Sequence, residues 1–432
     1  MAYQYSLCSQ ERRMYYKRFA DDMLIERLKG AGAVLIRGPK GCGKTETALQ
    51  VAKSTILMDT DVSVPYAMEL DPGRLLVGDV PHLIDQWQEY PHIWNYVKRE
   101  VDTRKLAGQF ILTGSFSKNK TKDKNIRLHS GSARVSIIDM RPMSLYERKW
   151  STGEVSLENL IQGELPFSKE VSVTLKELVD QLILGGWPTN LNRTAANAAQ
   201  SMVDYVTLTS EVDIQKATEI GFNPLKVMNL MRSYARNIST EASLATLTWD
   251  VNGSEPIVVT DTASAYIDGL KRVWVIEDLP AWSTHIRSRD TLRKGPKRHF
   301  VDPSLAIGAL SLSAEKLLNN LQYLGFLFES LVIRDLRIYA DVYGGKVYHY
   351  RDSSNLEVDA IIEYPDGRWA AFEIKMGFGK QDEGAKNLLR FAQKVNTTKI
   401  GEPEALTVIT FNGFAYRRKD GVNVVPIGTL RA

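Results

Sequence analysis

The 432-residue sequence has little cysteine and no long apolar run. Its two cysteines, Cys8 and Cys42, are too few for a disulfide framework or for a zinc site made of four cysteines. No window approaches the roughly 20 apolar residues that a membrane-spanning helix needs. The segment Met1–Arg13 has no apolar core of signal-peptide length. We therefore expect a cytoplasmic protein that is not associated with a membrane.

The sequence also has little net charge, because 55 lysine and arginine residues stand against 51 aspartate and glutamate residues. A net charge of +4 argues against a uniformly basic protein that wraps nucleic acid, although local basic patches remain compatible with it. The proportions of 25% charged and 44% hydrophobic residues exclude a disordered or collagen-like chain. The length suits about three domains of about 150 residues each.

The first of these domains, residues 1–150, alternates short apolar runs with helical stretches, which is typical of a parallel α/β sheet. The expected strands are Ala33–Arg37, Ser54–Asp59, Arg74–Val77, His82–Asp85, Gln109–Thr113 and Arg134–Asp139.

Three further regions follow. Residues 151–174 are acidic and rich in turn residues, which indicates a linker, and residues 175–310 are mainly helical. Residues 311–432 form another α/β pattern. Its expected elements are a helix at Leu317–Ala340, strands at Lys346–Arg351, Glu357–Glu363 and Arg368–Lys375, a helix at Gly384–Val395 and a strand at Ala405–Phe411.

The strongest motif follows the first expected strand. It reads Gly38-Pro39-Lys40-Gly41-Cys42-Gly43-Lys44-Thr45 and matches the phosphate-loop pattern G-x-x-x-x-G-K-[ST]. Glycines let the backbone N–H groups of such a loop point at phosphates, beside a helix N-terminus that favours anions. Lys44 is expected to reach the β- and γ-phosphates of ATP, and the Thr45 hydroxyl to hold Mg²⁺. Cys42 is interpreted as a small loop residue.

A phosphate loop needs a second acidic residue for the metal, at the end of a neighbouring strand. Asp79 and Asp85 both follow apolar runs, and hydrophobic context barely separates them. The sequence Gln86-Trp87-Gln88-Glu89 after Asp85, together with Phe110-Ile111-Leu112-Thr113-Gly114-Ser115, favours Asp85. This succession resembles a large group of prokaryotic AAA-type ATPases that carry a nuclease-like C-terminal domain of unknown function.

The resemblance implies roles for single residues. Asp85 matches the aspartate that orders Mg²⁺, and Thr113 and Ser115 match the polar sensor position near the γ-phosphate. Gln86 stands where the family has a glutamate that polarises the attacking water. An amide cannot accept that proton, so ATP binding with slow hydrolysis is expected, whether Gln86 is natural or was introduced to trap the ATP-bound state.

AAA-type sites usually take an arginine finger from the next subunit. Arg127 and Arg134 are the candidates for this finger because they follow the sensor strand closely. Ordinary surface arginines are the alternative interpretation. Because such sites form between subunits, the resemblance predicts a homo-oligomeric ring, with a hexamer as the preferred number of subunits.

The middle region has helical segments at Leu225–Asn237, Ser243–Asp250 and Asp261–Leu270, and then an expected strand at Val273–Glu277. Three helices followed by a β-hairpin are the succession of a winged helix-turn-helix. The wing would be residues 285–299, which carry one acidic residue, Asp290, and six basic residues: Arg287, Arg289, Arg293, Lys294, Lys297 and Arg298. Basic loops of this kind contact DNA phosphates without reading sequence, although a solvated charge run is the alternative.

The C-terminal region holds three acidic residues and a lysine in a suggestive order: Glu329, Asp359, Glu373 and Lys375. Glu373 and Lys375 lie two positions apart on one strand and so share a face. The set resembles the core of PD-(D/E)xK nucleases. That resemblance implies that Asp359 and Glu373 bind Mg²⁺, that Lys375 activates the attacking water and that Glu329 supports the metal.

The predicted fold class is therefore multi-domain α/β. It comprises an AAA-like P-loop sheet, a helical winged-helix middle domain and a PD-(D/E)xK nuclease-like C-terminal domain. The leading interpretation is an ATPase coupled to Mg²⁺-dependent cleavage of branched or broken DNA, which it recognises by structure rather than sequence. The alternative is an ATP-dependent switch whose nuclease-like domain is inactive and binds a protein partner.

Overall fold

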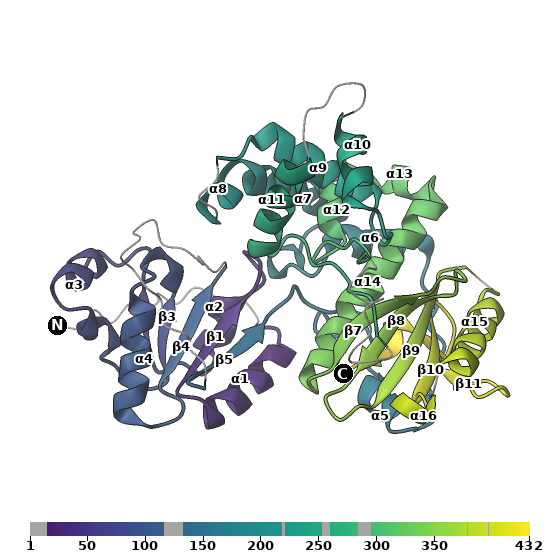
Figure 1. The fold of residues 1–432 in the computed structure, drawn as a ribbon, viewed down its shortest axis with the longest axis horizontal. Helices are drawn as coiled ribbons and strands as arrows, with labels where there is room; N and C mark the ends of the chain where they lie inside the picture. Colours follow the sequence, from purple (N-terminus) through teal and green to yellow (C-terminus); the bar gives the residue numbers. More distant parts are fainter. Residues whose placement is uncertain are drawn as a thin grey trace.

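The computed structural model describes residues 15–115, 133–217, 221–252, 260–283, 295–377, 379–395 and 397–432. The chain forms an N-terminal α/β unit, a helical unit and a C-terminal α/β unit, with the helical unit above the other two in Figure 1. Over the described ranges, no helix is long and apolar enough to cross a membrane.

The N-terminal unit is built on a five-stranded sheet of order β2-β3-β4-β1-β5, in which every neighbouring pair is parallel. Its elements are α1 (Phe19–Gly30), β1 (Ala33–Arg37), α2 (Lys44–Leu49), β2 (Ser54–Leu57), α3 (Val64–Leu70), β3 (His82–Asp85), α4 (Ile93–Arg104), β4 (Phe110–Gly114) and β5 (Val135–Asp139). The central strands β3 and β4 are buried along their whole length, as strands covered on both faces must be.

One expected strand of this unit is wrong. Residues 74–77 lie mostly in the 3₁₀-helix η1 (Pro72–Leu76), and the strand pairing with β2 is β3 instead. Pro72 stands at the start of η1, where its fixed φ suits a helical turn, and the Asp71 side chain accepts a hydrogen bond from the Gly73 N–H. Asp79 therefore does not end a strand of the sheet, whereas Asp85 ends β3.

The helical unit contains α6 (Leu175–Leu184), η3 (Pro188–Asn190), α7 (Ala195–Leu208), η4 (Thr209–Asp213), α8 (Ile214–Ala217), α9 (Pro224–Arg236), α10 (Leu244–Asn252), α11 (Thr260–Arg272), α12 (Ser304–Leu310) and α13 (Ala314–Leu318). The three helices expected in the middle region correspond to α9, α10 and α11. The winged helix itself stays a prediction, because residues 284–294, which include most of the wing, lie outside the described residues.

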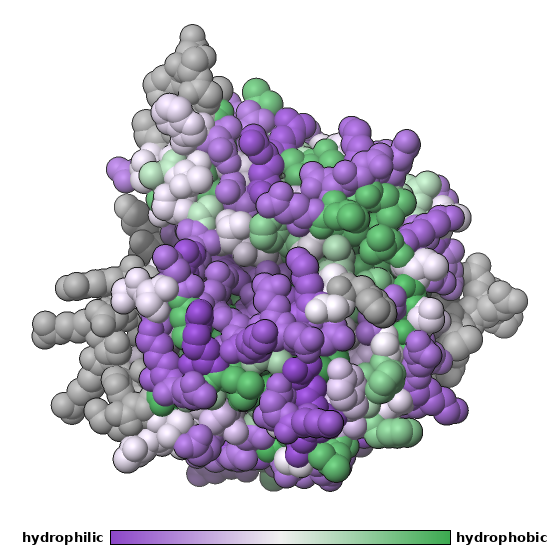
Figure 2. All heavy atoms as spheres, turned by 90° about the vertical axis from the view of Figure 1, so that its right-hand side faces the viewer, coloured by the Kyte–Doolittle hydropathy of each residue, from purple (hydrophilic) through white to green (hydrophobic). Residues whose placement is uncertain are grey.

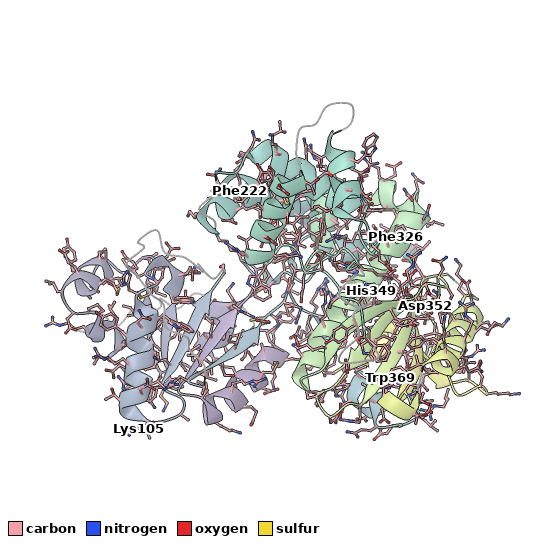
Figure 3. All side chains as sticks on the ribbon, viewed as in Figure 1. Lys105, Phe222, Phe326, His349, Asp352 and Trp369 are labelled. Atoms are coloured by element: carbon pink, nitrogen blue, oxygen red, sulfur yellow. The ribbon has the colours of Figure 1, made fainter. Side chains whose placement is uncertain are left out.

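The strand expected at residues 273–277 is absent from the described structure. Two isolated antiparallel bridges, Ile276 with Phe300 and Leu279 with Lys297, join the two segments around the wing instead. A parallel bridge from Ala281 to His349 then attaches this strip to the C-terminal sheet. His349 lies at the junction between the helical unit and that sheet (Figure 3).

The C-terminal unit is a six-stranded mixed sheet of order β11-β12-β10-β9-β8-β7 with helices on both faces. Its elements are α14 (Leu321–Val342), β7 (Lys346–Arg351), β8 (Glu357–Glu363), β9 (Trp369–Lys375), α15 (Gln381–Lys394), α16 (Thr397–Ile400), β10 (Ala405–Thr410), β11 (Tyr416–Arg417), β12 (Asn423–Pro426) and β13 (Leu430–Arg431). Ile362 of β8 belongs to the same core as α14, and its neighbour Ile361 packs in the core that contains Leu388 of α15. This alternation follows from the two-residue period of a strand.

The segment expected as a linker, residues 151–174, belongs to the C-terminal unit instead. β6 (Val155–Ser156) pairs in parallel with β13, and the side chains of α5 (Leu157–Ile161) at Leu157, Leu160 and Ile161 are buried. The Val173 N–H donates to Asn412 Oδ1 over 2.7 Å. Burial of these apolar side chains fixes a segment whose composition resembles that of a loop.

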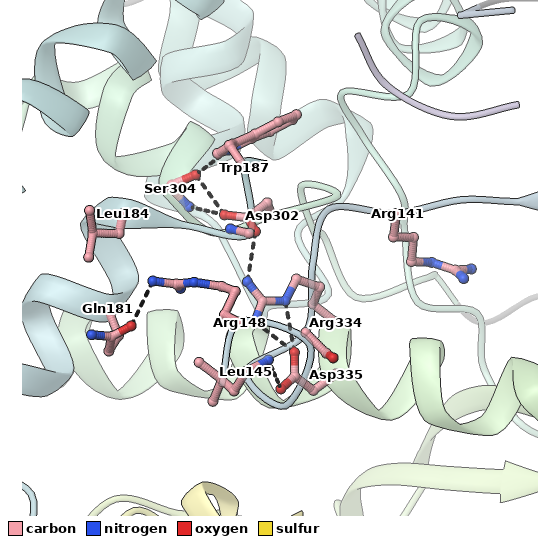
Figure 4. Close-up of polar contacts among 12 residues, drawn as sticks. Arg141, Leu145, Arg148, Gln181, Leu184, Trp187, Asp302, Ser304, Arg334 and Asp335 are labelled. Carbon is pink, nitrogen blue, oxygen red and sulfur yellow. Dashed lines mark hydrogen bonds and ion pairs between the residues drawn. The ribbon is translucent and has the colours of Figure 1, made fainter. Parts of the chain in front are cut away.

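Buried ion pairs connect the three units. Arg334 of α14 contacts Asp302 Oδ2 at 2.8 Å and Asp335 Oδ1 at 2.7 Å. The second oxygen of Asp335 accepts a hydrogen bond from the Leu145 N–H, and Asp302 Oδ2 accepts one from the Gly186 N–H. Figure 4 shows this network between α14 and the segments that follow β5 and α6. By contrast, the outer face on the side of the C-terminal unit is mostly hydrophilic (Figure 2).

Candidate functional site

The phosphate loop connects the end of β1 to the start of α2, at the carboxyl edge of the parallel sheet. Gly43 has φ 104° and caps α2, a conformation that favours glycine. A side chain at Gly38 would place its Cβ 2.0 Å from the Met140 carbonyl oxygen, so only glycine fits there. Cys42 is fully buried, in keeping with a small loop residue.

The polar groups expected around Mg²⁺–ATP lie together at this edge. Asp85 and Thr113 are register partners on β3 and β4, and both the Thr45 hydroxyl (2.9 Å) and the Thr113 hydroxyl donate to Asp85 Oδ1. Lys44 Nζ donates to the carbonyls of Gly38 (3.0 Å) and Pro39 (2.7 Å). This arrangement fits the expected ligand set, with a hydroxyl and a carboxylate beside the lysine that would meet phosphate.

Gln86 and Ser115 line the same cavity as the phosphate loop. Gln86 has φ 55°, the left-handed conformation, directly after β3. Its side-chain oxygen accepts a hydrogen bond from Gln88 Nε2 over 2.6 Å. The amide is therefore held at the position where the family resemblance implies a glutamate.

The cavity, of about 580 Å³, is shared between two units. Besides the phosphate loop, its lining includes three residues that precede α1: Tyr15, Tyr16 and Arg18. The helical unit contributes Pro188, Thr189 and Leu191. Lys40 of the phosphate loop pairs with Asp213 across this junction at 2.5 Å, and the Tyr205 hydroxyl donates to the Lys40 carbonyl over 3.3 Å. No motif in the sequence predicted that these residues outside the phosphate loop would contact the cavity or Lys40.

Of the two arginine candidates, only Arg134 lies in the described part of the chain, and it is not at this cavity. Arg134 precedes β5 and pairs with Asp102 Oδ1 at 2.8 Å, at the edge of the sheet opposite the phosphate loop. Arg127 lies outside the described residues. The arginine finger stays a prediction. Arg134 could act as this finger only at the nucleotide site of another subunit.

The four residues expected in the C-terminal unit do come together. Lys375 Nζ lies 2.5 Å from Glu373 Oε2 and 3.7 Å from Asp359 Oδ2, and Asp359 Oδ2 accepts the Ile374 N–H over 2.8 Å. A cavity of about 440 Å³ is lined by Asp359, Glu373 and Lys375 together with Asn355, Glu357, Glu383, Lys386, Asn387 and Arg390. Glu329 of α14 is linked to Asp359 through a fifth residue that the motif did not predict.

That residue is Lys297, which had been assigned to the DNA-binding wing. Its side chain is only 2% exposed, and Nζ lies 2.8 Å from Glu329 Oε1, 2.7 Å from Glu357 Oε1 and 3.4 Å from Asp359 Oδ1. Burial works to lower the pKa of Lys297, but the three carboxylates outweigh it and hold that pKa well above its usual range. The Lys297 ammonium therefore faces these carboxylates and is not on the surface where the predicted DNA contact would lie.

Arg298 is the second correction to the wing. Its side chain is buried, because Nη1 pairs with Asp278 at 3.0 Å and Nε donates to the Ala242 carbonyl over 2.9 Å. The remaining wing residues Arg287, Arg289, Arg293 and Lys294 lie outside the described residues, so DNA binding through them stays a prediction.

The acidic cluster does not fit the Mg²⁺ site that the nuclease resemblance implies. Among the described residues, no group of three or more histidine, cysteine, aspartate or glutamate side chains could hold a metal ion. Glu329, Glu357 and Asp359 face the Lys297 ammonium instead, and Glu373 faces Lys375. Burial raises the pKa of Glu329 to about 7 and that of Glu373 to about 8. At Asp359 burial acts in the same direction, but Lys297 and Lys375 outweigh it and lower the pKa.

Three family models match separate parts of the chain. Residues 31–149 match the AAA domain, and residues 175–316 and 324–430 match two domains of unknown function, DUF8612 and DUF4143. No curated protein matches the sequence. A Walker-type ATPase of Pyrococcus abyssi resembles the fold with a TM-score of 0.39 and 12% identity, over 69% of this chain and 97% of that chain.

The structural neighbour is too loosely similar to place any residue, so the assignment rests on the N-terminal unit itself. The phosphate-loop motif, the convergence of Lys44, Thr45 and Asp85 at one edge of a parallel sheet, and the family match over residues 31–149 agree. The AAA family implies nucleotide binding, usually with Mg²⁺. Residues 31–149 therefore form an AAA-type ATPase domain with a phosphate loop.

Proposed function

We propose that this protein is an ATP-dependent switch, in which the helical unit senses the nucleotide bound at the phosphate loop and hydrolysis is slow because of Gln86. The observation that carries the proposal is the shared cavity. Its wall includes Pro188, Thr189 and Leu191 of the helical unit, so a nucleotide that fills it touches both units. A ligand shifts a conformational equilibrium only through contacts that differ between the two states, and a nucleotide in this cavity would make such contacts if the helical unit moves.

The residues at the cavity have separate tasks in this proposal. Lys44 exchanges its bonds to loop carbonyls for bonds to phosphate, while Thr45 and Asp85 hold the metal ion of Mg²⁺–ATP. That ion neutralises charge on the phosphates when it is bound. Gln86 orients a water molecule through its amide but cannot take the proton of that water.

ATP binding and hydrolysis test the nucleotide part of the proposal. We expect a fluorescent ATP analogue to bind the unmodified protein and to lose binding on Lys44→Ala. We expect Gln86→Glu to raise the hydrolysis rate by about 10²–10⁴-fold, the usual contribution of a general base. Gln50→Glu, on the exposed end of α2, is the matched control and should leave the rate unchanged. Equal rates for the unmodified protein and Gln86→Glu would refute the role of Gln86.

Hydrogen exchange tests the switch separately. With ATP and Mg²⁺ we expect slower exchange at residues 188–191, which adjoin the cavity, and faster exchange at residues 205–213, because phosphate would draw Lys40 away from Asp213. Lys44→Ala should abolish both changes. If ATP binds while exchange in both segments is unaltered, the protein is an ATPase but not a switch of this kind.

We further propose that the switch assembles as a homo-hexamer in the presence of ATP. AAA-type sites are completed by an arginine from the next subunit, and Arg134 lies away from the phosphate loop of its own subunit. Sedimentation with ATP and Mg²⁺ tests assembly. A monomer under these conditions would exclude both the ring and the finger.

A further inference from the structure

A single ammonium group stands among the carboxylates of the C-terminal unit. Lys297 Nζ contacts Glu329 on α14 and both Glu357 and Asp359 on β8, at distances of 2.7–3.4 Å. Its side chain is 2% exposed, and of its three partners only Glu357, at 40%, is open to solvent. The lysine comes from the part of the chain that matches one family model, and its carboxylate partners come from the part that matches another.

The backbone holds this lysine in place. The Lys297 N–H donates to the Leu279 carbonyl over 3.0 Å, and the Leu279 N–H donates back to the Lys297 carbonyl over 2.9 Å. The adjacent residues are fixed to β7, because the Trp282 N–H donates to the His349 carbonyl over 2.7 Å and the His349 N–H donates to the Pro280 carbonyl over 2.9 Å. The ammonium therefore belongs to a strip hydrogen-bonded to the sheet that carries the cluster.

A divalent metal ion and this ammonium compete for the same oxygens. Mg²⁺ and Ca²⁺ bind carboxylate oxygens at about 2.0–2.6 Å, whereas Lys297 contacts Glu329 Oε1 and Asp359 Oδ1 directly. Two cations this close repel each other strongly in a buried site. The second lysine, Lys375, adds another positive charge beside Asp359 and Glu373.

We propose that Lys297 is the resident cation of this acidic cluster and takes the place of a divalent metal ion, so that the cluster binds no divalent cation while Lys297 is present. The lysine then has a structural task, because it joins α14 to β8 through Glu329 and Glu357. In this arrangement the C-terminal unit has no metal-dependent phosphodiester cleavage of its own. The inference is independent of the ATP switch.

Manganese binding to the full-length, nucleotide-free protein tests the inference by electron paramagnetic resonance. An Asp85→Ala background removes metal binding at the phosphate loop from the measurement. In this background we expect no Mn²⁺ site at the cluster. We expect Lys297→Met to create one site, with affinity at least about a hundredfold tighter because a unit positive charge has left a buried site. Adding Asp359→Asn should remove that site again.

Lys346→Met is the matched control, since Lys346 forms an ion pair with Asp341 but its side chain is 66% exposed. It should gain no Mn²⁺ site. The inference is overturned if the protein with Lys297 intact binds one Mn²⁺ that Asp359→Asn abolishes, or if a folded Lys297→Met variant gains no site. Should Lys297→Met not fold, the comparison of the Lys297-containing protein with and without Asp359→Asn still decides.

Discussion

An Arg334→Met substitution would leave two buried carboxylates without their partner. Asp302 and Asp335 are both fully buried, and Arg334 itself is 1% exposed. Arg334 reaches one oxygen of Asp302 through Nη1 and one oxygen of Asp335 through Nε and Nη2. Removing one member of a buried ion pair costs about 3–5 kcal/mol, because an uncompensated charge stays inside. We expect a loss of about this size, because two carboxylates are affected while Arg148 beside them still compensates part of their charge.

Urea denaturation of the full chain measures this loss as a lower unfolding midpoint. Methionine is chosen because it keeps an unbranched apolar side chain of similar length, which separates loss of charge from loss of packing. Arg236→Met, on the exposed side of α9, is the control for an arginine-to-methionine change. We expect the control to change the free energy of unfolding by less than about 0.5 kcal/mol, as surface substitutions usually do.

A triple variant distinguishes buried charge from other causes. Asp302→Asn and Asp335→Asn added to Arg334→Met remove both unpaired charges, so we expect the triple variant to recover part of the lost stability. The Leu145 and Gly186 N–H groups can still donate to the asparagine oxygens. The reasoning is refuted if Arg334→Met unfolds at the urea midpoint of the control, or if the triple variant is less stable than Arg334→Met.

Three further predictions concern the contacts between units and the phosphate loop. Burial raises the pKa of Glu277 but Arg141 lowers it more, so it falls from 4.5 to about 2. The resulting stability is present above pH 4.5 and lost as pH falls towards 2. Between pH 7 and pH 3 the free energy of unfolding of the unmodified protein should therefore fall by about 2 kcal/mol more than that of Glu277→Gln. Equal losses for the two proteins in calorimetry would contradict this. Asp213→Ala should alter ATP affinity, because it frees Lys40, and a fluorescence titration with no change in affinity would show that the pair is passive. Gly38→Ala should abolish ATP binding through the clash of its Cβ with a backbone carbonyl, and retained binding in the same titration would contradict the loop geometry.

The sequence predicted most strands because their signals are local. Strands His82–Asp85, Lys346–Arg351 and Glu357–Glu363 have the expected boundaries. Leu75 and Leu76 gave an equally apolar run, yet both are buried within a 3₁₀-helix. Apolar character predicts burial, and the backbone conformation of a short run depends on its neighbours.

The linker prediction failed for a related reason. Residues 151–174 have the polar and turn-rich composition of a loop, but pairing of β6 with β13 joins them to a strand about 275 residues away. Such non-local pairing has no composition signal. The phosphate loop shows the opposite case, because all its functional groups lie within eight consecutive residues and were found from the motif.

Four residues of the acidic cluster were predicted from a sequence motif, whereas the position of the fifth, Lys297, follows only from the fold. Glu329, Asp359, Glu373 and Lys375 were predicted together because a known order of residue types links them. Lys297 had no such signal, and its basic neighbours favoured a DNA-contacting surface. Its burial among carboxylates depends on the bridges that attach residues 279–282 to β7, which are contacts of tertiary structure.

A continuous series of contacts leads from the phosphate loop to the other units. Arg18 donates to the Cys42 carbonyl within the loop and to the Arg141 carbonyl, each over 2.8 Å. The Arg141 side chain pairs in turn with Glu277, between α11 and α12, and with Asp341 at the end of α14. A series of contacts does not by itself transmit a signal, because coupling needs an element with two arrangements that both sites bias.

We propose the Lys40–Asp213 pair as this element. Lys40 lines the nucleotide cavity and also pairs with Asp213 of the helical unit, so a bound phosphate would offer its ammonium a second anionic partner. Phosphate that recruits Lys40 releases Asp213, whereas the Arg18 contacts involve carbonyls that phosphate does not displace. The nucleotide is thus expected to loosen one junction while the other persists, which is the geometry of a hinge rather than of a dissociation.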